Sequence, residues 1–269
     1  MPRGLDHIVH AVYDLDAAGE FYRRLGFQVG ARNQHPWGTH NRIIQFDRSY
    51  IELLTVAEPD KIAPHGPRSF SFGAFHRDAL ARGQGLDMLL LKAHGAKEDA
   101  AAFSAAGIGN FDIFNFEREG KRPDGATVKL AFSLVFAADP NAPETGFATC
   151  QHYFPENFWN PAFQQHDNGV TRIAGVVMVA QEPARHRDFL HTFTSSQKSH
   201  ETSDGFIIDL PRAAIEMVTP AAFHHRFGVP APDTSPGARL AALRFAVTDT
   251  GVAGIQTAMG AVMQFEPGA

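Results

Sequence analysis

The sequence predicts an α+β fold in which tandem βαβββ modules pair into cupped mixed sheets, with the last module truncated. Three observations predict this fold. Residues 5–27 show the pattern of a strand, a turn and an amphipathic helix closed by a glycine. The same pattern returns from Leu86 at a constant offset, so that Leu5–Asp6 aligns with Leu86–Asp87. Strand-like segments separated by turns follow each of these two helices.

The first module begins with the strand LDHIVHA. Alternation along a strand puts His7 on one face, and Ile8 and His10 on the other. Asp16 is expected to cap the helix that follows, because a short acidic side chain suits that position. Gly26 is expected just past the last helical turn, where a left-handed residue is favoured.

Three strands are expected after each helix. In the first module, turns at residues 36–38 and 47–49 divide the segment into strands. In the second module, FDIFNFERE and TVKLAFSLVF are separated by a turn at residues 123–125, and the strand GFATCQHYF follows a proline-rich turn. The repeating unit is therefore a strand, a helix and three strands.

Two weaker copies of the strand–helix pattern occur later in the chain. The third copy lies at residues 170–193 and the fourth at residues 239–259. The third has a shortened strand region, and the fourth is cut off near Ala269. We therefore expect a degenerate second pair of modules.

The domain boundary is expected at the polar, turn-rich residues 164–169. Residues 1–165 would form the N-terminal pair, with modules at 1–60 and 84–160. Residues 166–269 would form the C-terminal pair. A chain of 269 residues is long enough for two such units, each with a core.

Composition disfavours several classes of protein. A net charge of −5 without a long basic run argues against a nucleic-acid partner. No apolar segment approaches the ~20 residues of a membrane helix, and Asp6 and His7 interrupt any signal-peptide pattern. The single cysteine, Cys150, excludes an intrachain disulfide and suits a reducing compartment, so a cytoplasmic location with no membrane partner is expected.

Four segments carry a resemblance to a known family: LDHIVHAVYDLDAAGEFYRRLGF, GTHNRIIQF, YIELL and CQHYFPENFWNPAFQQHDNGV. Together they resemble the vicinal oxygen chelate superfamily, and most closely its glyoxalase-like members. This superfamily holds glyoxalase I, extradiol dioxygenases, fosfomycin-resistance enzymes and bleomycin-binding proteins. The resemblance covers the first two modules well and the last third of the chain loosely. It implies the cupped sheet but no single reaction, since the fold hosts many.

The resemblance implies metal ligands on the first and last strands of each module, converging in the cup. In this sequence those strands offer His7 and Glu52 in the first module, and His152 or conceivably Gln151 in the second, where a register slip of one residue would exchange the faces. Met88 stands at the fourth position and is not a ligand for a hard or borderline metal. Two imidazoles and one carboxylate leave open positions for water or a chelating substrate, as in catalytic zinc sites and iron(II) facial triads. The implied cofactor is a divalent ion: Zn, Fe, Mn or Ni.

Each of these residues also has a structural interpretation. A histidine on a strand is more often a hydrogen-bonded structural residue than a ligand. Glu52 could face solvent at a strand edge, but its neighbours Ile51 and Leu53 are apolar, and a carboxylate on a buried face needs a partner. His10 has the wrong parity for the site, so we expect it against the helix or exposed.

Aromatic residues are dense in the segment that follows the second module. This segment is either a connector that joins two domains or the wall of an apolar pocket, and Phe154, Phe158 and Trp159 are its expected pocket residues. His40 is expected at the pocket rim, near a hairpin. A Cys150/His152 nucleophile pair is disfavoured, because residues two apart on a strand lie ~6–7 Å from each other.

The second pair of modules is expected to lack a metal. Glu216 alone matches a ligand position there, and one carboxylate cannot hold a metal by itself. In the extradiol dioxygenases the iron lies in the C-terminal pair, so this sequence departs from that arrangement. The second half is therefore expected to support or cover the first.

The sequence predicts a metal-dependent lyase or isomerase of the glyoxalase kind, acting on a small oxygen-bearing molecule. Glu52 is the first candidate for a general base. One alternative is a non-catalytic binder like the bleomycin-resistance proteins, which Met88 at a ligand position favours. Another is an iron-dependent dioxygenase that uses the first half. A homodimer through the sheet edge left by the truncated module is also considered.

Overall fold

The computed structural model describes residues 1–121, 125–248 and 251–267. Its first half contains the two expected modules. The first module consists of β1 (Leu5–Ala11), α1 (Leu15–Arg24), β2 (Asn33–Gln34), β3 (Thr39–Phe46) and β4 (Ser49–Val56). The connection consists of η1 (Pro59–Lys61) and α2 (Phe72–Arg82). The second module consists of β5 (Gly85–Lys92), α3 (Ala96–Ala105), β6 (Phe114–Lys121), β7 (Thr127–Ala137) and β8 (Gly146–His152).

The second half repeats the plan less completely. It is reached through α4 (Pro155–Phe158) and η2 (Pro161–Phe163). The third module consists of β9 (Val170–Val179), η3 (Pro183–His186), α5 (Arg187–Thr194), β10 (Ser199–Thr202), β11 (Gly205–Leu210) and β12 (Ala213–Val218). The last part consists of α6 (Pro220–Phe227), β13 (Arg239–Val247), β14 (Gly254–Ala258) and β15 (Ala261–Pro267).

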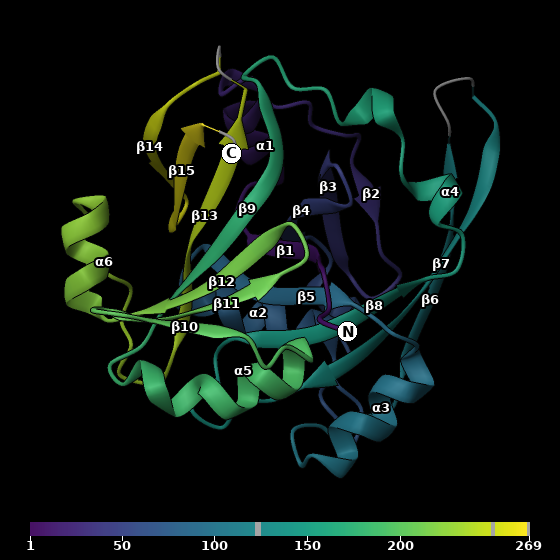
Figure 1. The fold of residues 1–269 in the computed structure, drawn as a ribbon. Helices are drawn as coiled ribbons and strands as arrows, with labels where there is room; N and C mark the ends of the chain where they lie inside the picture. Colours follow the sequence, from purple (N-terminus) through teal and green to yellow (C-terminus); the bar gives the residue numbers. More distant parts are fainter. Residues whose placement is uncertain (122–124, 249–250, 268–269) are drawn as a thin grey trace.

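The strands form two mixed sheets, which confirms the predicted α+β class (Figure 1). The eight-stranded sheet has the order β2-β3-β4-β1-β5-β8-β7-β6, and the seven-stranded sheet has the order β10-β11-β12-β9-β13-β15-β14. In the first sheet, β1 and β5 pair antiparallel at the centre, and each has the last strand of its own module parallel beside it. The second sheet repeats this arrangement around β9 and β13.

Three local predictions for the first half can be compared with the structure: the cap of α1, the glycine after α1, and the turn between β6 and β7. The cap of α1 is Asp14, not Asp16, because the helix begins two residues earlier than expected. The Asp14 carboxylate accepts hydrogen bonds from the backbone N–H groups of Asp16 and Ala17. Gly26 does adopt a positive φ of 82°. Of the turn predicted between β6 and β7, residues 122–124 lie outside the described part of the chain.

The helix predicted in the fourth copy is wrong for the described residues of that segment. The spacing of Val252, Ile255 and Met259 suits a helical face, but residues 254–258 form the strand β14, which pairs with β15. Met259 and Gly260 adopt positive φ values of 49° and 75°, so the chain turns into a hairpin there. The last module thus keeps strands in place of its helix.

One apolar core lies between the two sheets. The inner face of the first sheet contributes Ile8 and Leu89, and that of the second contributes Met178 and Leu243, all fully buried. Phe245 connects the halves, since its ring centroid lies 5.4 Å from that of Phe27 and 5.7 Å from that of Phe46. The outer face of the eight-stranded sheet remains for a separate cluster, and it carries the candidate site.

This shared core predicts that the two sheets unfold together. Phe245→Ala should lower the free energy of unfolding by about 3–5 kcal/mol, because it leaves a cavity between the sheets. Urea denaturation followed by circular dichroism and by tryptophan fluorescence should give one coincident transition. Ile255→Ala, at a side chain that is 39% exposed, is the control and should change little. Separate transitions for the two probes would contradict a common core.

Candidate functional site

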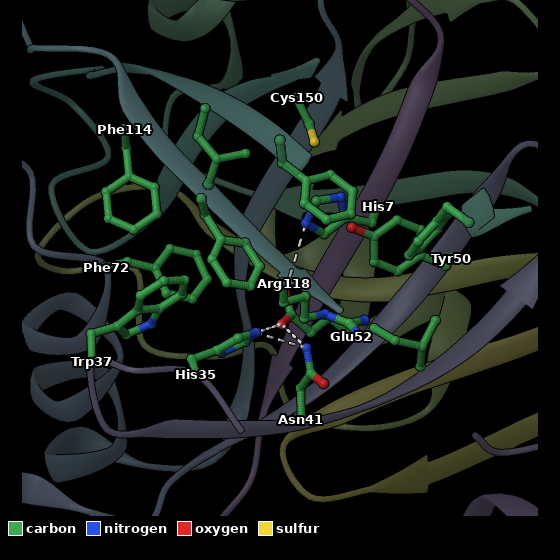
Figure 2. A pocket seen from close by; sticks show the side chains of 15 residues that line it. His7, His35, Trp37, Asn41, Tyr50, Glu52, Phe72, Phe114, Arg118 and Cys150 are labelled. Atoms are coloured by element: carbon green, nitrogen blue, oxygen red, sulfur yellow. Dashed lines mark hydrogen bonds and ion pairs between the residues drawn. The ribbon is translucent and has the colours of Figure 1, made fainter. Parts of the chain in front are cut away.

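A small cavity opens on the outer face of the eight-stranded sheet. The volume of the cavity is about 60 Å³, which is room for only a few water molecules or a small ligand. Most of its wall is apolar, and the polar groups gather on one side (Figure 2). The lining residues are His7, His35, Trp37, Asn41, Ile43, Tyr50, Glu52, Phe72, Phe114, Phe116, Arg118, Phe132, Leu134, Cys150 and Phe158.

His7 and Glu52 approach each other in this cavity, as the sequence analysis expected. β1 pairs parallel with β4, with Val9 opposite Glu52 and His7 opposite Tyr50, so His7 and Glu52 share one face. The Nε2 of His7 lies 3.7 Å from the Oε2 of Glu52. The Tyr50 ring stacks on the His7 imidazole at 4.2 Å, which fixes the plane of that imidazole.

Asp6 holds the other side of the His7 ring. An irregularity in the pairing of β1 with β5 between Leu5 and His7 allows the Asp6 side chain to reach the same face as its neighbour. Its carboxylate lies 2.7 Å from His7 Nδ1 and 3.1 Å from His152 Nε2. Burial alone would raise the pKa of Asp6, but the two histidines hold this pKa well below its usual range. Because an ionised carboxylate only accepts hydrogen bonds, His7 donates from Nδ1, and its Nε2 faces Glu52.

A second histidine lies on the far side of Glu52. Asn41 donates from Nδ2 to Glu52 Oε1 at 2.5 Å, and the Nε2 of His35 lies 4.0 Å from the same oxygen. The other ring nitrogen of His35 is 2.8 Å from the Thr39 hydroxyl. Burial lowers the pKa of His35 to about 4, although Glu52 opposes the shift. His35 is therefore a neutral imidazole at pH 7.

Cys150 lies behind His7. One carboxylate oxygen of Asp6, one ring nitrogen of His7 and the Sγ of Cys150 lie within 4.8 Å of one another. In the described part of the chain, these three residues form a group whose atoms could bind one metal ion. Burial raises the pKa of the Cys150 thiol well above its ordinary value, and the nearby carboxylates of Asp6 and Glu52 raise it further. A protonated, buried thiol is a poor nucleophile, which agrees with the expectation that Cys150 and His152 do not form a nucleophile pair.

His152 occupies a different place from the one expected. Its Nε2 bonds to Asp6, its ring stacks near Trp159 at 5.6 Å, and it does not line the cavity. The register explains this. The module offset takes Val9 to Leu90, and Leu90 pairs with Ala148, so Ala148 is the counterpart of Glu52 and His152 lies four residues farther along β8.

Of the other predicted pocket residues, one lines the cavity and three do not. Phe158 lines the cavity, whereas Phe154 and Trp159 do not. Trp159 lies outside the cavity, and its ring centroid is 5.9 Å from that of Tyr50. His40 contacts Arg32 and Glu58, and it is not among the residues that line the cavity.

The sequence did not identify four residues of the site: Asp6, which contacts His7, and His35, Asn41 and Arg118, which line the cavity. Asp6 follows from an irregular pairing that alternation cannot show. Asn41 and Arg118 do carry a signal, since Asn41 is on the inward parity of a hairpin strand and Arg118 interrupts the alternating pattern of β6. His10, by contrast, lies where its parity predicted, buried on the inner face and hydrogen-bonded to the Tyr22 hydroxyl of α1 at 2.9 Å.

The second sheet has a glutamate, Glu216, at the position equivalent to Glu52, and ion pairs occupy it. Glu216 pairs with Val177 of β9 as Glu52 pairs with Val9 of β1. Ion pairs with Arg226 and Arg244 occupy both of its oxygens. Glu216 is therefore neutralised within the protein, and the described residues give it no free position for a ligand.

Comparison with known proteins agrees with the fold. The chain matches the glyoxalase-like domain family over residues 5–194 and belongs to that family. This confirms the resemblance to the vicinal oxygen chelate superfamily. A hypothetical protein from Staphylococcus aureus has a similar structure, with a TM-score of 0.71 at 14% identity over 99% of this chain and 100% of that one.

A more distant similarity involves an enzyme. A mutant of 4-hydroxymandelate synthase from Streptomyces coelicolor aligns with a TM-score of 0.51 at 12% identity, over 93% of this chain and 72% of that one. Identities this low establish the shared fold alone. No curated protein sequence gave a match. Among the described residues, no helix is long and apolar enough to cross a bilayer.

The state of His35 can be measured by its effect on stability. Its pKa is about 4 in the folded protein and near 6.5 in the unfolded chain, so the unfolded state binds more protons between these values. The stability of the metal-free protein should fall as the pH drops from about 6.5 to about 4. His35→Gln should reduce this fall, and NMR titration of the His35 ring should show no protonation above pH 5. A His35 ring that titrates near 6.5 would contradict the assignment.

Proposed function

We propose that the protein is a metal-dependent lyase or isomerase of the glyoxalase kind, which acts on a small oxygen-bearing molecule in this cavity. One observation carries the proposal: His7 Nε2 and Glu52 Oε2 face each other at 3.7 Å inside an apolar wall. A lone pair and a carboxylate oxygen that face each other repel unless a proton or a cation lies between them. The pair therefore fits a proton or a cation, and we propose the cation because the Asp6 carboxylate orients the His7 ring as in metal-bound histidines.

The donor geometry supports a divalent ion. Two atoms that bind one ion at about 2.1 Å lie no more than about 4.2 Å apart, so a separation of 3.7 Å admits an ion between them. The Asp6 carboxylate on His7 Nδ1 is the partner that metal-bound histidines usually have. One imidazole and one carboxylate suit Zn, Fe, Mn or Ni and do not distinguish among them.

The number of protein ligands limits the affinity. Catalytic zinc sites usually have three protein ligands, whereas here the counterpart positions hold Met88 and Ala148, and His152 is bonded to Asp6. His152 enters the proposal as the residue that holds Asp6 in place. Water or the vicinal oxygens of a substrate would complete the coordination, so binding of the metal alone should be modest.

Glu52 would move the proton. When bound, the metal would act as a Lewis acid toward a carbonyl or hydroxyl oxygen of the substrate. Asn41 holds Glu52 Oε1, so Oε2 would accept a proton from carbon only where it is released from the metal or does not bind it. The aromatic walls exclude water from this step, and the neutral ring of His35 keeps a second positive charge away from the carboxylate.

Metal binding gives the first test. Protein dialysed against Zn, Mn, Ni or Fe(II) should retain close to one ion per chain, measured by elemental analysis in buffers of defined free metal. His7→Ala should lose it, because the ring is the ligand that Asp6 orients. His225→Ala, at an exposed position, is the matched control. Equal metal content in wild type and His7→Ala would contradict the proposed ligand, and near-zero content in both would remove the metal from the proposal.

Proton transfer gives the second test. The metal-loaded protein should exchange a C–H bond next to an oxygen-bearing carbon in D₂O for at least one compound in a panel of small carbonyl and hydroxy compounds, followed by NMR. Glu52→Gln should slow this exchange by about 10²-fold or more, because the amide cannot accept the proton. Glu20→Gln, on the exposed side of α1, should have no effect. Exchange that survives in Glu52→Gln would exclude Glu52 as the base.

A non-catalytic binder is the second candidate. The loss of two of the four ligand positions, at Met88 and Ala148, is the observation that favours it. This function predicts saturable binding of a small molecule without metal and without exchange. The two tests above separate it from the enzyme, and the small size of the cavity argues against a bulky drug as its ligand.

A further inference from the structure

Arg118 extends from an edge strand into the cavity. Side chains of β6 alternate between exposed and half-buried, and the half-buried series Phe114, Phe116 and Arg118 faces the cavity. A guanidinium therefore takes the place of a third phenylalanine in an otherwise apolar row. Figure 2 shows it on the same side of the cavity as Glu52.

Within residues 1–121, 125–248 and 251–267, this guanidinium forms no ion pair. No carboxylate of the described residues lies within 4.0 Å of it, and its Nη1 donates a hydrogen bond to the carbonyl oxygen of Glu119 at 3.2 Å. Burial lowers the pKa of Arg118, although Tyr50 and Glu52 partly offset the shift. Asn41 already donates to Glu52, so the carboxylate is not held by Arg118. A half-buried cation without an ion-pair partner is costly unless an anion joins it.

Arg118 also stands where a second hollow meets the first. The second hollow shares Ile43, Arg118 and Phe158 with the cavity. Its volume is about 370 Å³, against about 60 Å³ for the cavity, and Lys121 adds another cation to its wall. A ligand that enters from this hollow passes the guanidinium before it reaches Glu52. The junction therefore suits an anionic group at one end of a small molecule.

We propose that Arg118 is the anion receptor of this cavity, and that the natural substrate is a small organic acid with an apolar body. Its anionic oxygens would take two N–H donors of the guanidinium. Its body would lie along the phenylalanines of β6, with its reacting carbon toward Glu52. The inference rests on the proposed function for the direction of the substrate, but the anion site itself is independent of catalysis.

Matched probes that differ in charge test the anion site. Benzoate and benzamide have nearly the same shape, and only benzoate carries a charge. Trp37 lines the cavity, and the chain has two tryptophans, so Trp159→Phe leaves Trp37 as the single reporter. Titrations of the full chain at constant ionic strength, with fluorescence of Trp37 as the signal, would be run with each probe. Acetate and phenylacetate extend the series, and phenylphosphonate tells a phosphonate-type group from a carboxylate.

The expected result is saturable binding of benzoate or one of its homologues, at least about tenfold tighter than that of benzamide. Arg118→Met should remove this difference without changing the weak binding of benzamide. Arg118→Lys should restore part of it, since the charge remains and the fork is lost. Arg24→Met, an exposed position at the end of α1, should behave as wild type.

Three outcomes would overturn the proposal: equal affinity for benzoate and benzamide, an unchanged preference for benzoate in Arg118→Met, or no saturable binding of any anion in the series. Circular dichroism and the melting temperature of Arg118→Met show whether that variant is folded, and Arg118→Lys gives the same comparison with the charge retained. The titrations are repeated with and without metal. Anion binding that persists while metal binding and exchange fail would refute the proposed function alone.

Discussion

The candidate site depends on one buried carboxylate that two histidines share. Asp6 lies between His7 and His152, and this arrangement determines which nitrogen of His7 faces the cavity. The position of Asp6 results from an irregular pairing in the central strand of the sheet, which turns its side chain onto the same face as the next residue. Tyr50 fixes the plane of the His7 ring, but without the Asp6 carboxylate the tautomer that presents Nε2 to Glu52 would not be defined.

Much of the fold could be predicted from the sequence, because its repeats have regular spacing. The strands of the first two modules follow from alternation and from turn residues such as Gly38 and Gly125. The fourth module was harder, because the apolar spacing of Val252, Ile255 and Met259 fits a helix as well as one face of a hairpin. The segment forms a strand because it pairs with β15, and the apolar spacing within the segment does not show this pairing.

The site was predictable only in part, for a related reason. The resemblance implied that His7 and Glu52 converge, and they do lie on one face of adjacent strands. The histidine of β8 has the correct parity, but parity does not report how far along the strand a residue lies, and His152 is four residues beyond the counterpart of Glu52. Arg118 interrupts the alternating pattern of β6, but that local signal does not show that this edge strand reaches the cavity.

The two sheets keep the same acid at equivalent positions and treat it differently. Glu216 is enclosed by two arginines, whereas Glu52 has an amide and two imidazoles around it. Glu216 therefore shows how the same position behaves when arginines of the chain neutralise the carboxylate. In the second sheet this acid joins two arginines to the scaffold, whereas in the first sheet no arginine or lysine forms an ion pair with it among the described residues, which is where the proposed ligand would bind.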